Sequence, residues 1–389
     1  MLNSLRRPPL YITALALILI MSGLRWFAGG TDFSYFFTAG TDFVDSQSTP
    51  HPVVTMEGQG YDGQFFYRLA MDPFNWDKTA NGVTIDYPSY RVQRIGYPFL
   101  AWLFSFGGIP VMVPFALWLV NLLSFAGIIY YFKRIAEKFR ADSWFHFVPL
   151  LVCGIYMSVA KSLSEVTELF FFLAAFHAIL DKRMVLFACF GSAAVLTRET
   201  AVIPMVALSV VFFFQYSDDG KVRSRLLAAV PFMMLICWKL FLAFVFRDEP
   251  APPSLGNFTW PFKGIADGFM ANMNFTSRFY ALQSAFWLMY FIWQTWFSLL
   301  VFKASLSKRI TLRQPYAYPL AVYFAWLIFS VFFSAAIYGD DWSFVRVLAL
   351  MNIAGFAVMV AFRQTLNRYF VLFSIMMVAL TVIRMILRP

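Results

Sequence analysis

Residues 109–132 read IPVMVPFALWLVNLLSFAGIIYYF and are followed at once by Lys133 and Arg134. No charged residue interrupts this run. An α-helix needs about 20 apolar residues to cross a hydrocarbon layer about 30 Å thick. The run therefore predicts a membrane-spanning helix that ends in a basic, cytoplasmic turn.

Comparable runs recur along the whole chain of 389 residues, which is 60% hydrophobic and only 13% charged. This composition excludes an ordinary soluble globular protein. Since hydrocarbon offers the backbone no hydrogen-bond partners, spans of this kind are expected to be helical. We therefore expect an all-α polytopic membrane protein, with a single membrane domain over 1–389 and about eleven spans. The expected spans are 8–28, 109–132, 144–160, 164–180, 184–197, 200–215, 226–246, 278–302, 316–336, 345–362 and 369–386.

The charges fix the expected orientation of these spans. A cytoplasmic N-terminus places every basic cluster between spans on the cytoplasmic side, as the positive-inside rule requires. The net charge of +10 is thereby explained without a nucleic-acid partner. The apolar stretch 10–24 also fits a secretory signal, but Arg25 and Trp26 follow it in place of small cleavage-site residues, so it is expected to be the first span. The basic clusters lie at 133–140, 182–183, 221–225, 303–313 and 363–368.

Two extracytoplasmic loops are expected, 29–96 and 247–275. In the first, residues 61–71 carry apolar side chains at helical spacing, which is typical of an amphipathic helix at the membrane interface. The stretch 88–106 begins polar and becomes apolar, and is expected to be a second interfacial helix. The second loop contains several prolines and aromatics, which favour an irregular segment. We expect this segment to cap a cavity.

Polar residues interrupt two pairs of short spans, with KSLSE at 161–165 and TRET at 197–200. Charges held near the bilayer are costly and usually face a cavity or a partner. We expect both breaks to be turns that line one outward-facing cavity. Ordinary interfacial turns with no further role are the alternative.

The most informative string is YDGQFFYRLAMDPF at 61–74. A carboxylate beside a glycine and framed by aromatics suits recognition of a polar group carried on a lipid. Asp62 can take a proton from an attacking hydroxyl, and Gly63 lets the acceptor approach closely. The neighbouring Tyr61 and Gln64 are expected substrate contacts. Alternatively, Asp62 caps a helix that begins near Gly63.

Six cations are expected on the outer side, against the positive-inside trend. Guanidinium groups match phosphate oxygens, and a preorganised cation in a low-dielectric site stabilises the charge of a departing phosphate. The alternative is ion pairing with outer carboxylates, such as Lys161 with Glu165 and Arg198 with Glu199. Both carboxylates therefore belong to the expected site. The six cations are Arg68, Arg91, Arg94, Lys161, Arg198 and Arg346.

Three other acidic residues are candidates for chemistry. Asp32 follows the first span and is the second candidate for a catalytic acid or base. Asp340 and Asp341 can hold a divalent cation or an acceptor, or can lie in a solvated turn. The three histidines have no metal-ligand spacing, so no metal site is assigned, and dependence on a divalent cation stays open.

The strings at 61–74, 90–98 (YRVQRIGYP) and 196–200 (LTRET) resemble the bacterial cell-surface glycopolymer formation proteins. These are integral-membrane glycosyltransferases of the GT-C class. The aromatic-Asp-Gly element is also similar to the first luminal loop of glycosylphosphatidylinositol mannosyltransferases. The resemblance is best over 29–200, and beyond that it rests on hydropathy.

The resemblance implies a GT-C fold in the inner membrane, with the active site on the periplasmic side. It implies inverting transfer of a sugar from a polyprenyl-phosphate donor, undecaprenyl phosphate in bacteria, to an extracytoplasmic glycan or glycolipid acceptor. Carried over to this chain, Asp62 is the catalytic acid or base and Asp32 its rival. Arg91, Arg94 and Arg198 are expected to face the lipid phosphate.

Two other classes of membrane protein are alternatives. A glycan polymerase or ligase also takes lipid-linked sugars, but its main outer loop is expected late in the chain. A transporter binds its substrate near the bilayer midplane. Lys239 is the only strongly basic residue well inside an expected span, so the sequence gives a transporter little support.

Overall fold

The computed structural model describes residues 10–215, 222–248, 256–273, 275–307 and 311–387. The chain is 72% helical. Strands in the described residues are limited to two pairs of two-residue segments in the first loop. The expected all-α class is thereby confirmed.

Every apolar run singled out in the sequence contains a helix. Among the described residues, four helices are long and apolar enough to cross a membrane, and a fifth crossing results if the bent pair η2–α6, with its 53° break, is one span. The other helices in these runs fall short of that test, so the count of eleven spans stays a prediction. The helices are α1 (Leu10–Ala28), α5 (Val113–Lys138), η2 (Ser143–Leu151), α6 (Cys153–Ala160), α7 (Glu165–Leu180), α8 (Met184–Thr197), α9 (Val202–Gln215), α10 (Val222–Val245), α12 (Arg278–Leu306), α13 (Ala317–Ser330), α15 (Asp341–Val347), α16 (Ala349–Ala361) and α17 (Arg368–Leu387).

The outside of the helical bundle is strongly apolar. Large hydrophobic side chains are exposed on several helices, among them Ile20 on α1, Leu240 and Phe244 on α10, and Leu372 on α17. Water does not favour such a surface, whereas lipid does. Together with the four long apolar helices, this indicates a membrane protein.

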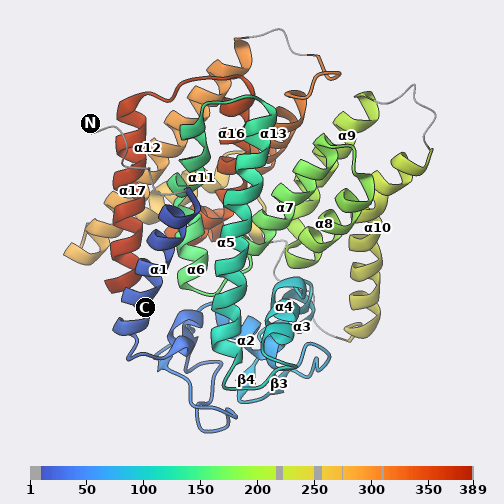
Figure 1. Cartoon of the computed structure of the whole chain (residues 1–389). Coiled ribbons are helices and arrows are strands. Elements are labelled where there is room, and N and C mark those ends of the chain that lie inside the picture. Colours follow the sequence, from blue (N-terminus) through green and yellow to red (C-terminus); the bar gives the residue numbers. More distant parts are fainter. Residues whose placement is uncertain (1–9, 216–221, 249–255, 274, 308–310, 388–389) are drawn as a thin grey trace, which may run out of the picture.

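The turns of the bundle gather at two opposite ends. At one end, Lys138, Arg140, Leu180, Pro315 and Arg363 surround a cavity of about 590 Å³. All five lie in or beside segments expected on the cytoplasmic side. The first loop lies at the other end of the helices (Figure 1). Successive helices thus alternate in direction as the charge pattern predicted for these segments.

The first loop is a folded layer beneath the bundle. After α1 the chain forms η1 (Phe33–Phe37), and β1 (Ala39–Gly40) then pairs in parallel with β2 (Thr55–Met56). The remaining elements are α2 (Gly63–Met71), the antiparallel pair β3 (Thr79–Ala80) and β4 (Val83–Thr84), α3 (Pro88–Val92) and α4 (Gly96–Phe104).

The expectation that 61–71 lies as a helix on the membrane surface is wrong. All nine residues of α2 are buried, because the rest of the loop and the bundle enclose it. Phe37 stacks on Tyr67 with ring centroids 4.4 Å apart, and Phe66 meets Tyr97 edge-on. The expected second interfacial helix, 88–106, is instead two short helices, α3 and α4, separated by residues 93–95.

The second loop is more regular than expected. Residues Lys263–Asn272 form the helix α11, whereas an irregular segment was predicted. Gly264 and Gly268 allow α11 to approach the backbone of Phe333 and Tyr338, at α14 (Ala335–Tyr338) and the turn before it. The parts of this loop at 249–255 and 274 lie outside the described residues.

The first loop packs on the bundle through Gly63. A Cβ atom on this residue would lie 2.5 Å from the Lys161 carbonyl oxygen and 2.8 Å from the Cα of Phe37. Both contacts are with backbone atoms, which cannot move aside cheaply. The close approach at Gly63 is thus made by the turn between α6 and α7.

Gly63→Ala is therefore expected to lower the free energy of unfolding by roughly 1–3 kcal/mol through overpacking. The melting temperature of the purified protein in detergent measures this. Gly23→Ala on α1 is the matched control, because its Cβ meets no protein atom within 4 Å. Equal melting temperatures for Gly63→Ala and the parent would contradict the tight packing.

Candidate active site

Asp62 precedes α2, but its side chain does not cap that helix. One carboxylate oxygen accepts a hydrogen bond from Arg91 Nη1 at 2.8 Å. The other accepts from Arg346 Nη1 and Nη2, at 3.3 and 3.2 Å. The capping alternative is therefore wrong, and Asp62 instead joins the first loop to α15 through ion pairs.

Arg91 is held by a second carboxylate, that of Asp86. Its Nε and Nη2 donate to the two Asp86 oxygens at 2.8 and 2.6 Å. The guanidinium also lies over the Phe65 ring, 4.2 Å from its centroid. These contacts fix the plane of Arg91 and leave Nη1 for Asp62.

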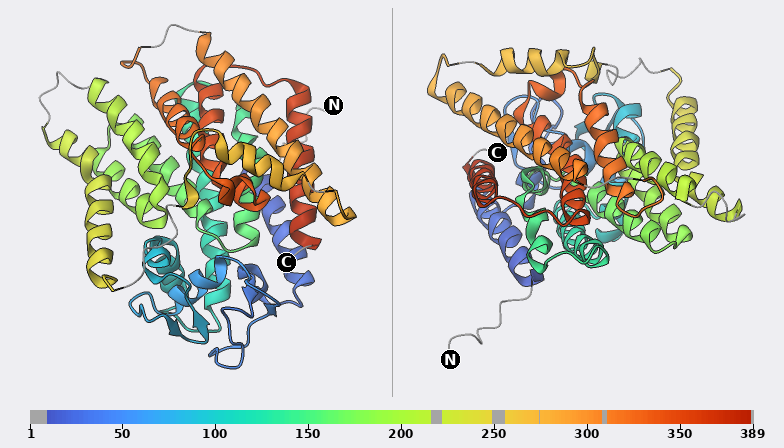
Figure 2. Two further views of the ribbon diagram at one scale, coloured as in Figure 1. Left: turned by 180° about the vertical axis from the view of Figure 1, so that it is seen from behind. Right: turned by 90° about the horizontal axis from the view of Figure 1, so that it is seen from above.

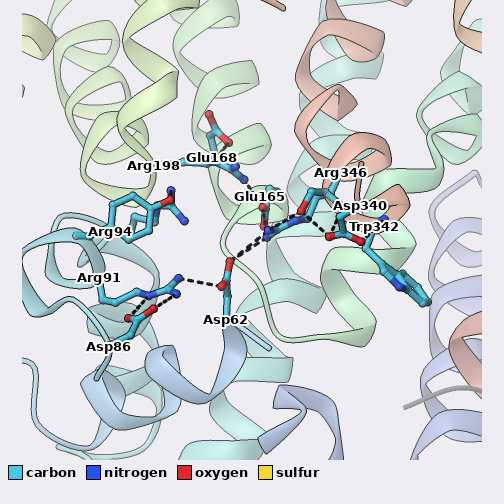
Figure 3. Close-up of polar contacts among 12 residues, drawn as sticks. Asp62, Asp86, Arg91, Arg94, Glu165, Glu168, Arg198, Asp340, Trp342 and Arg346 are labelled. Atoms are coloured by element: carbon cyan, nitrogen blue, oxygen red, sulfur yellow. Dashed lines mark hydrogen bonds and ion pairs between the residues drawn. The ribbon is translucent and has the colours of Figure 1, made fainter. Parts of the chain in front are cut away.

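Arg346 extends the network into the bundle. Its Nη1 donates to Glu165 Oε1 at 2.9 Å, at the start of α7. The same carboxylate is bonded by Arg198, at the end of α8, and Arg198 Nε lies 3.9 Å from Glu168. Figure 3 shows the resulting chain of ion pairs, which runs through Asp86, Arg91, Asp62, Arg346, Glu165, Arg198 and Glu168.

A further pair stands beside this chain. Arg94 Nε and Nη2 donate to the two oxygens of Glu199 at 3.1 and 2.9 Å, and Arg94 also bonds the Tyr90 hydroxyl. Glu199 is positioned by the break between α8 and α9, where Arg198 adopts an extended backbone. Arg198 and Glu199 are neighbours in the sequence, but Arg198 pairs with Glu165 and Glu199 pairs with Arg94. The alternative of an ion pair between Arg198 and Glu199 is therefore wrong.

Asp62 lies in the lining of two cavities. The first, of about 390 Å³, has four cations and two carboxylates in its lining, so its charged residues sum to a net positive charge. Its remaining wall is mostly apolar, from α9, α10, α13 and the turn after α13. The second, of about 400 Å³, is lined by Asp62, Asp86, Tyr87, Tyr90, Arg91, Gly256, Asn257, Ala336 and Arg346. We call the first the apolar-walled cavity, whose charged residues are Arg94, Arg198, Lys239, Arg346, Asp62 and Glu199, and the second the polar cavity.

The surroundings of Asp62 keep it ionised. Burial raises the pKa of its carboxyl group, but the positive charges of Arg91, Arg346 and Arg94 outweigh this and hold the pKa well below its ordinary value. Next to it, burial raises the pKa of the Tyr61 hydroxyl. Around neutral pH, Asp62 is therefore an anion and Tyr61 a neutral phenol.

Three of the expected site residues have structural contacts elsewhere. Asp32 caps η1, accepting from the Ser34 amide at 2.7 Å, and lines neither cavity. Arg68 is fully buried and donates to Asn75 Oδ1 at 3.0 Å. Gln64 accepts from the Gly40 amide at 2.9 Å. These side chains bond within the first loop and line neither cavity: Asp32 is held at the start of η1, and α2 places Gln64 and Arg68 in the interior of the loop.

Tyr61 and Lys161 lie beside the network. The Lys161 ammonium sits over the Tyr61 ring, 4.7 Å from its centroid, and the Arg346 guanidinium lies 5.1 Å from the same ring. Neither residue lines the two cavities. Tyr61 thus stabilises the Arg346 guanidinium through a cation–π contact.

In the turn at 340–341, where a divalent cation was one expected ligand, Asp340 caps a helix. Its carboxylate caps α15, accepting from the amides of Trp342 and Ser343 at 3.2 Å each. The side chain of Asp341 lies outside the described part of the chain. Within that part, no group of three His, Cys, Asp or Glu residues is placed to hold a metal ion.

Two members of the network were not predicted. Glu168 carried a usable signal, since it is a charged residue in an expected span, three positions after Glu165. Asp86 carried none, because nothing in its spacing distinguishes it from the other acids of the first loop.

Comparison of the chain with family models, curated proteins and solved structures yields no match.

The ion pairs of Asp62 make stability depend on pH. Because its folded pKa lies below the ordinary 3.8, its contribution is full above about pH 5 and is lost as pH falls below that ordinary value. Asp62→Asn is expected to melt at a lower temperature than the parent at pH 7, and the difference is expected to shrink between pH 4 and pH 3. A constant difference across that range would show that the carboxylate charge is not the cause.

Proposed function

We propose that this chain is a GT-C type glycosyltransferase with about eleven spans and an active site on the extracytoplasmic side of the cell inner membrane. It transfers a sugar from a polyprenyl-phosphate donor to an extracytoplasmic glycan or glycolipid. The observation that supports this best is the position of Asp62, an ionised carboxylate in the wall shared by two cavities of different character. The resemblance of 61–74, 90–98 and 196–200 to cell-surface glycopolymer formation proteins points the same way.

The apolar-walled cavity suits the donor. A polyprenyl-phosphate sugar combines a long hydrocarbon, a phosphate and a sugar, and this cavity combines apolar helix faces with Arg94, Arg198 and Arg346. Guanidinium groups bind phosphate oxygens in a defined orientation. The cations outnumber the carboxylates in its lining, so an anion is the ligand that balances the charge.

The polar cavity suits the acceptor. Asp62 is part of its lining, and Tyr87, Tyr90 and Asn257 supply hydrogen-bonding groups and aromatic surface. An acceptor hydroxyl bound here can reach the Asp62 carboxylate while arginines of the apolar-walled cavity hold the donor phosphate. Binding both substrates beside one base lets them be aligned for in-line displacement.

The proposed chemistry is an inverting displacement. The acceptor hydroxyl oxygen bonds to the anomeric carbon, and the bond from that carbon to the phosphate oxygen breaks. The hydroxyl proton passes to Asp62, and the polyprenyl phosphate leaves with the bonding electron pair. Arg94, Arg198 and Arg346 stabilise the charge that develops on the phosphate.

Donor binding also prepares Asp62 to act as a base. With Arg91 and Arg346 both bonded to it, the carboxylate is a weak proton acceptor. A phosphate that takes hydrogen bonds from Arg346 weakens the hold of this arginine on Asp62. The pKa of Asp62 then rises toward the range in which it accepts a proton.

The location of the charges favours an enzyme over a transporter. Asp62 lies in the first loop, Arg198 at the end of α8 and Glu165 at the start of α7. A transporter site is expected near the bilayer midplane, within broken helices. The network lies at the ends of the helices, where a loop covers it.

Asp62→Asn is expected to lower sugar transfer from a polyprenyl-phosphate sugar on the order of a hundredfold or more, since it removes the base at nearly constant size. Transfer by the purified protein in detergent, with a panel of lipid-linked donors, measures this. Asp32→Asn is the matched control and is expected to keep most of the parent's turnover, because Asp32 caps η1 away from both cavities. A loss in Asp32→Asn with full activity in Asp62→Asn would reverse the assignment.

Arg94→Ala is expected to weaken donor binding roughly tenfold or more, since it removes a charge-assisted phosphate contact. The dissociation constant of the lipid-linked donor, measured without an acceptor, reports this. Arg247→Ala is the control on the same side, because Arg247 is exposed and pairs only with its neighbour Asp248 among the described residues. Unchanged affinity in Arg94→Ala would contradict the phosphate assignment.

A further inference from the structure

Lys239 is a charged residue on a helix face that otherwise suits lipid. Of the four helices that pass as membrane spans, α10 is the least buried. The side chains of Met233, Met234, Ile236 and Leu240 are exposed around it, and Lys239 itself is exposed. Figure 2 shows α10 at the margin of the bundle, opposite the edge formed by α1 and α17.

The position of Lys239 along α10 makes its charge costly. It precedes the end of the helix, Val245, by six residues, which corresponds to about 9 Å at 1.5 Å per residue. An ammonium at this depth has to face a cavity, find a partner or extend toward the headgroups. Its presence on an apolar face therefore needs a reason.

The ammonium of Lys239 turns toward the site. It donates to Oε1 of Gln93, a buried residue between α3 and α4, and it lines the apolar-walled cavity together with Arg94. Trp238 Nε1 donates to the Gln93 carbonyl oxygen at 3.3 Å, which holds this part of α10 against the first loop. Among the described residues, Gln93 is the only hydrogen-bond partner of the Lys239 ammonium, which has three N–H donors.

We propose that Lys239 forms the opening of the apolar-walled cavity toward the lipid and is the first residue to bind the donor phosphate as the donor enters from the bilayer. The exposed face of Lys239 meets lipid, and its ammonium meets the cavity that holds Arg94, Arg198 and Arg346. A lipid phosphate that reaches α10 thus meets Lys239 first and finds three arginines in the lining of the same cavity. This assignment rests on the proposed function for the identity of the donor.

Binding of lipids to the full-length protein, measured by native mass spectrometry, tests this without turnover. The probes are a polyprenyl phosphate, the polyprenol of the same length and phosphatidylglycerol. Lys239→Met is expected to weaken polyprenyl phosphate binding roughly tenfold. Lys239→Arg is expected to restore it, and polyprenol binding is expected to stay as in the parent.

Lys263→Met is the matched control, since Lys263 lies on the exposed face of α11 and pairs with Asp267 at 2.5 Å. Equal polyprenyl phosphate affinity in Lys239→Met and the parent overturns the role of Lys239 and leaves the proposed function standing. An equal loss for phosphatidylglycerol shows a general lipid contact and also overturns it. If the parent binds no polyprenyl phosphate, both the entry role and the proposed donor are overturned.

Discussion

The pairing of Asp62 with Arg91 and Arg346 is the interaction on which the rest of this structure depends. Asp62 and Arg91 belong to the first loop, whereas Arg346 belongs to α15, 284 positions later in the chain. Through Glu165 and Arg198 the same network reaches α7 and α8. Removing one member leaves a buried charge without its partner, which costs more than the pair contributes. The covering loop and the helical bundle are therefore mutually dependent.

Such a network is an expensive way to hold a fold together, because every charge in it has lost most of its hydration. Apolar residues of similar size would pack at least as stably. The charges are better explained by the anionic donor that we propose for the apolar-walled cavity. Its cations are already oriented by carboxylates, so a phosphate meets fixed donors and the protein reorganises little. The same bonds keep Asp62 weakly basic, and in the proposed mechanism a donor phosphate that competes for Arg346 relieves this.

Hydropathy and charge placement predicted much of the architecture. Each apolar run contains a helix, and the turns at Lys138, Leu180 and Arg363 meet at one end as the positive-inside pattern required. Periodicity misjudged α2, because an apolar helix face reads the same whether lipid or a folded loop covers it. The prolines of the second loop suggested irregularity, yet α11 forms beyond them, where two glycines let it approach the α13–α14 turn.

The sequence predicted which residues come together better than it predicted which of them bond to one another. Asp62, Arg91, Arg94, Arg198 and Arg346 do converge, as their placement on one side of the expected membrane implied. Which carboxylate each arginine bonds depends on contacts between segments far apart in sequence, and spacing along the chain carries no information on these. Nothing in the spacing separates these arginines from Arg68, whose burial inside the loop follows only from how α2 is covered.

The most direct measurement is a cryo-electron microscopy structure of the protein in a lipid nanodisc with a non-hydrolysable phosphonate analogue of a polyprenyl-phosphate sugar. The account predicts the phosphonate within hydrogen-bond distance of Arg94, Arg198 or Arg346, with the lipid chain along the apolar wall and the anomeric carbon facing Asp62. Phosphonate density away from these arginines, or a sugar on the far side of the bundle from Asp62, would contradict it.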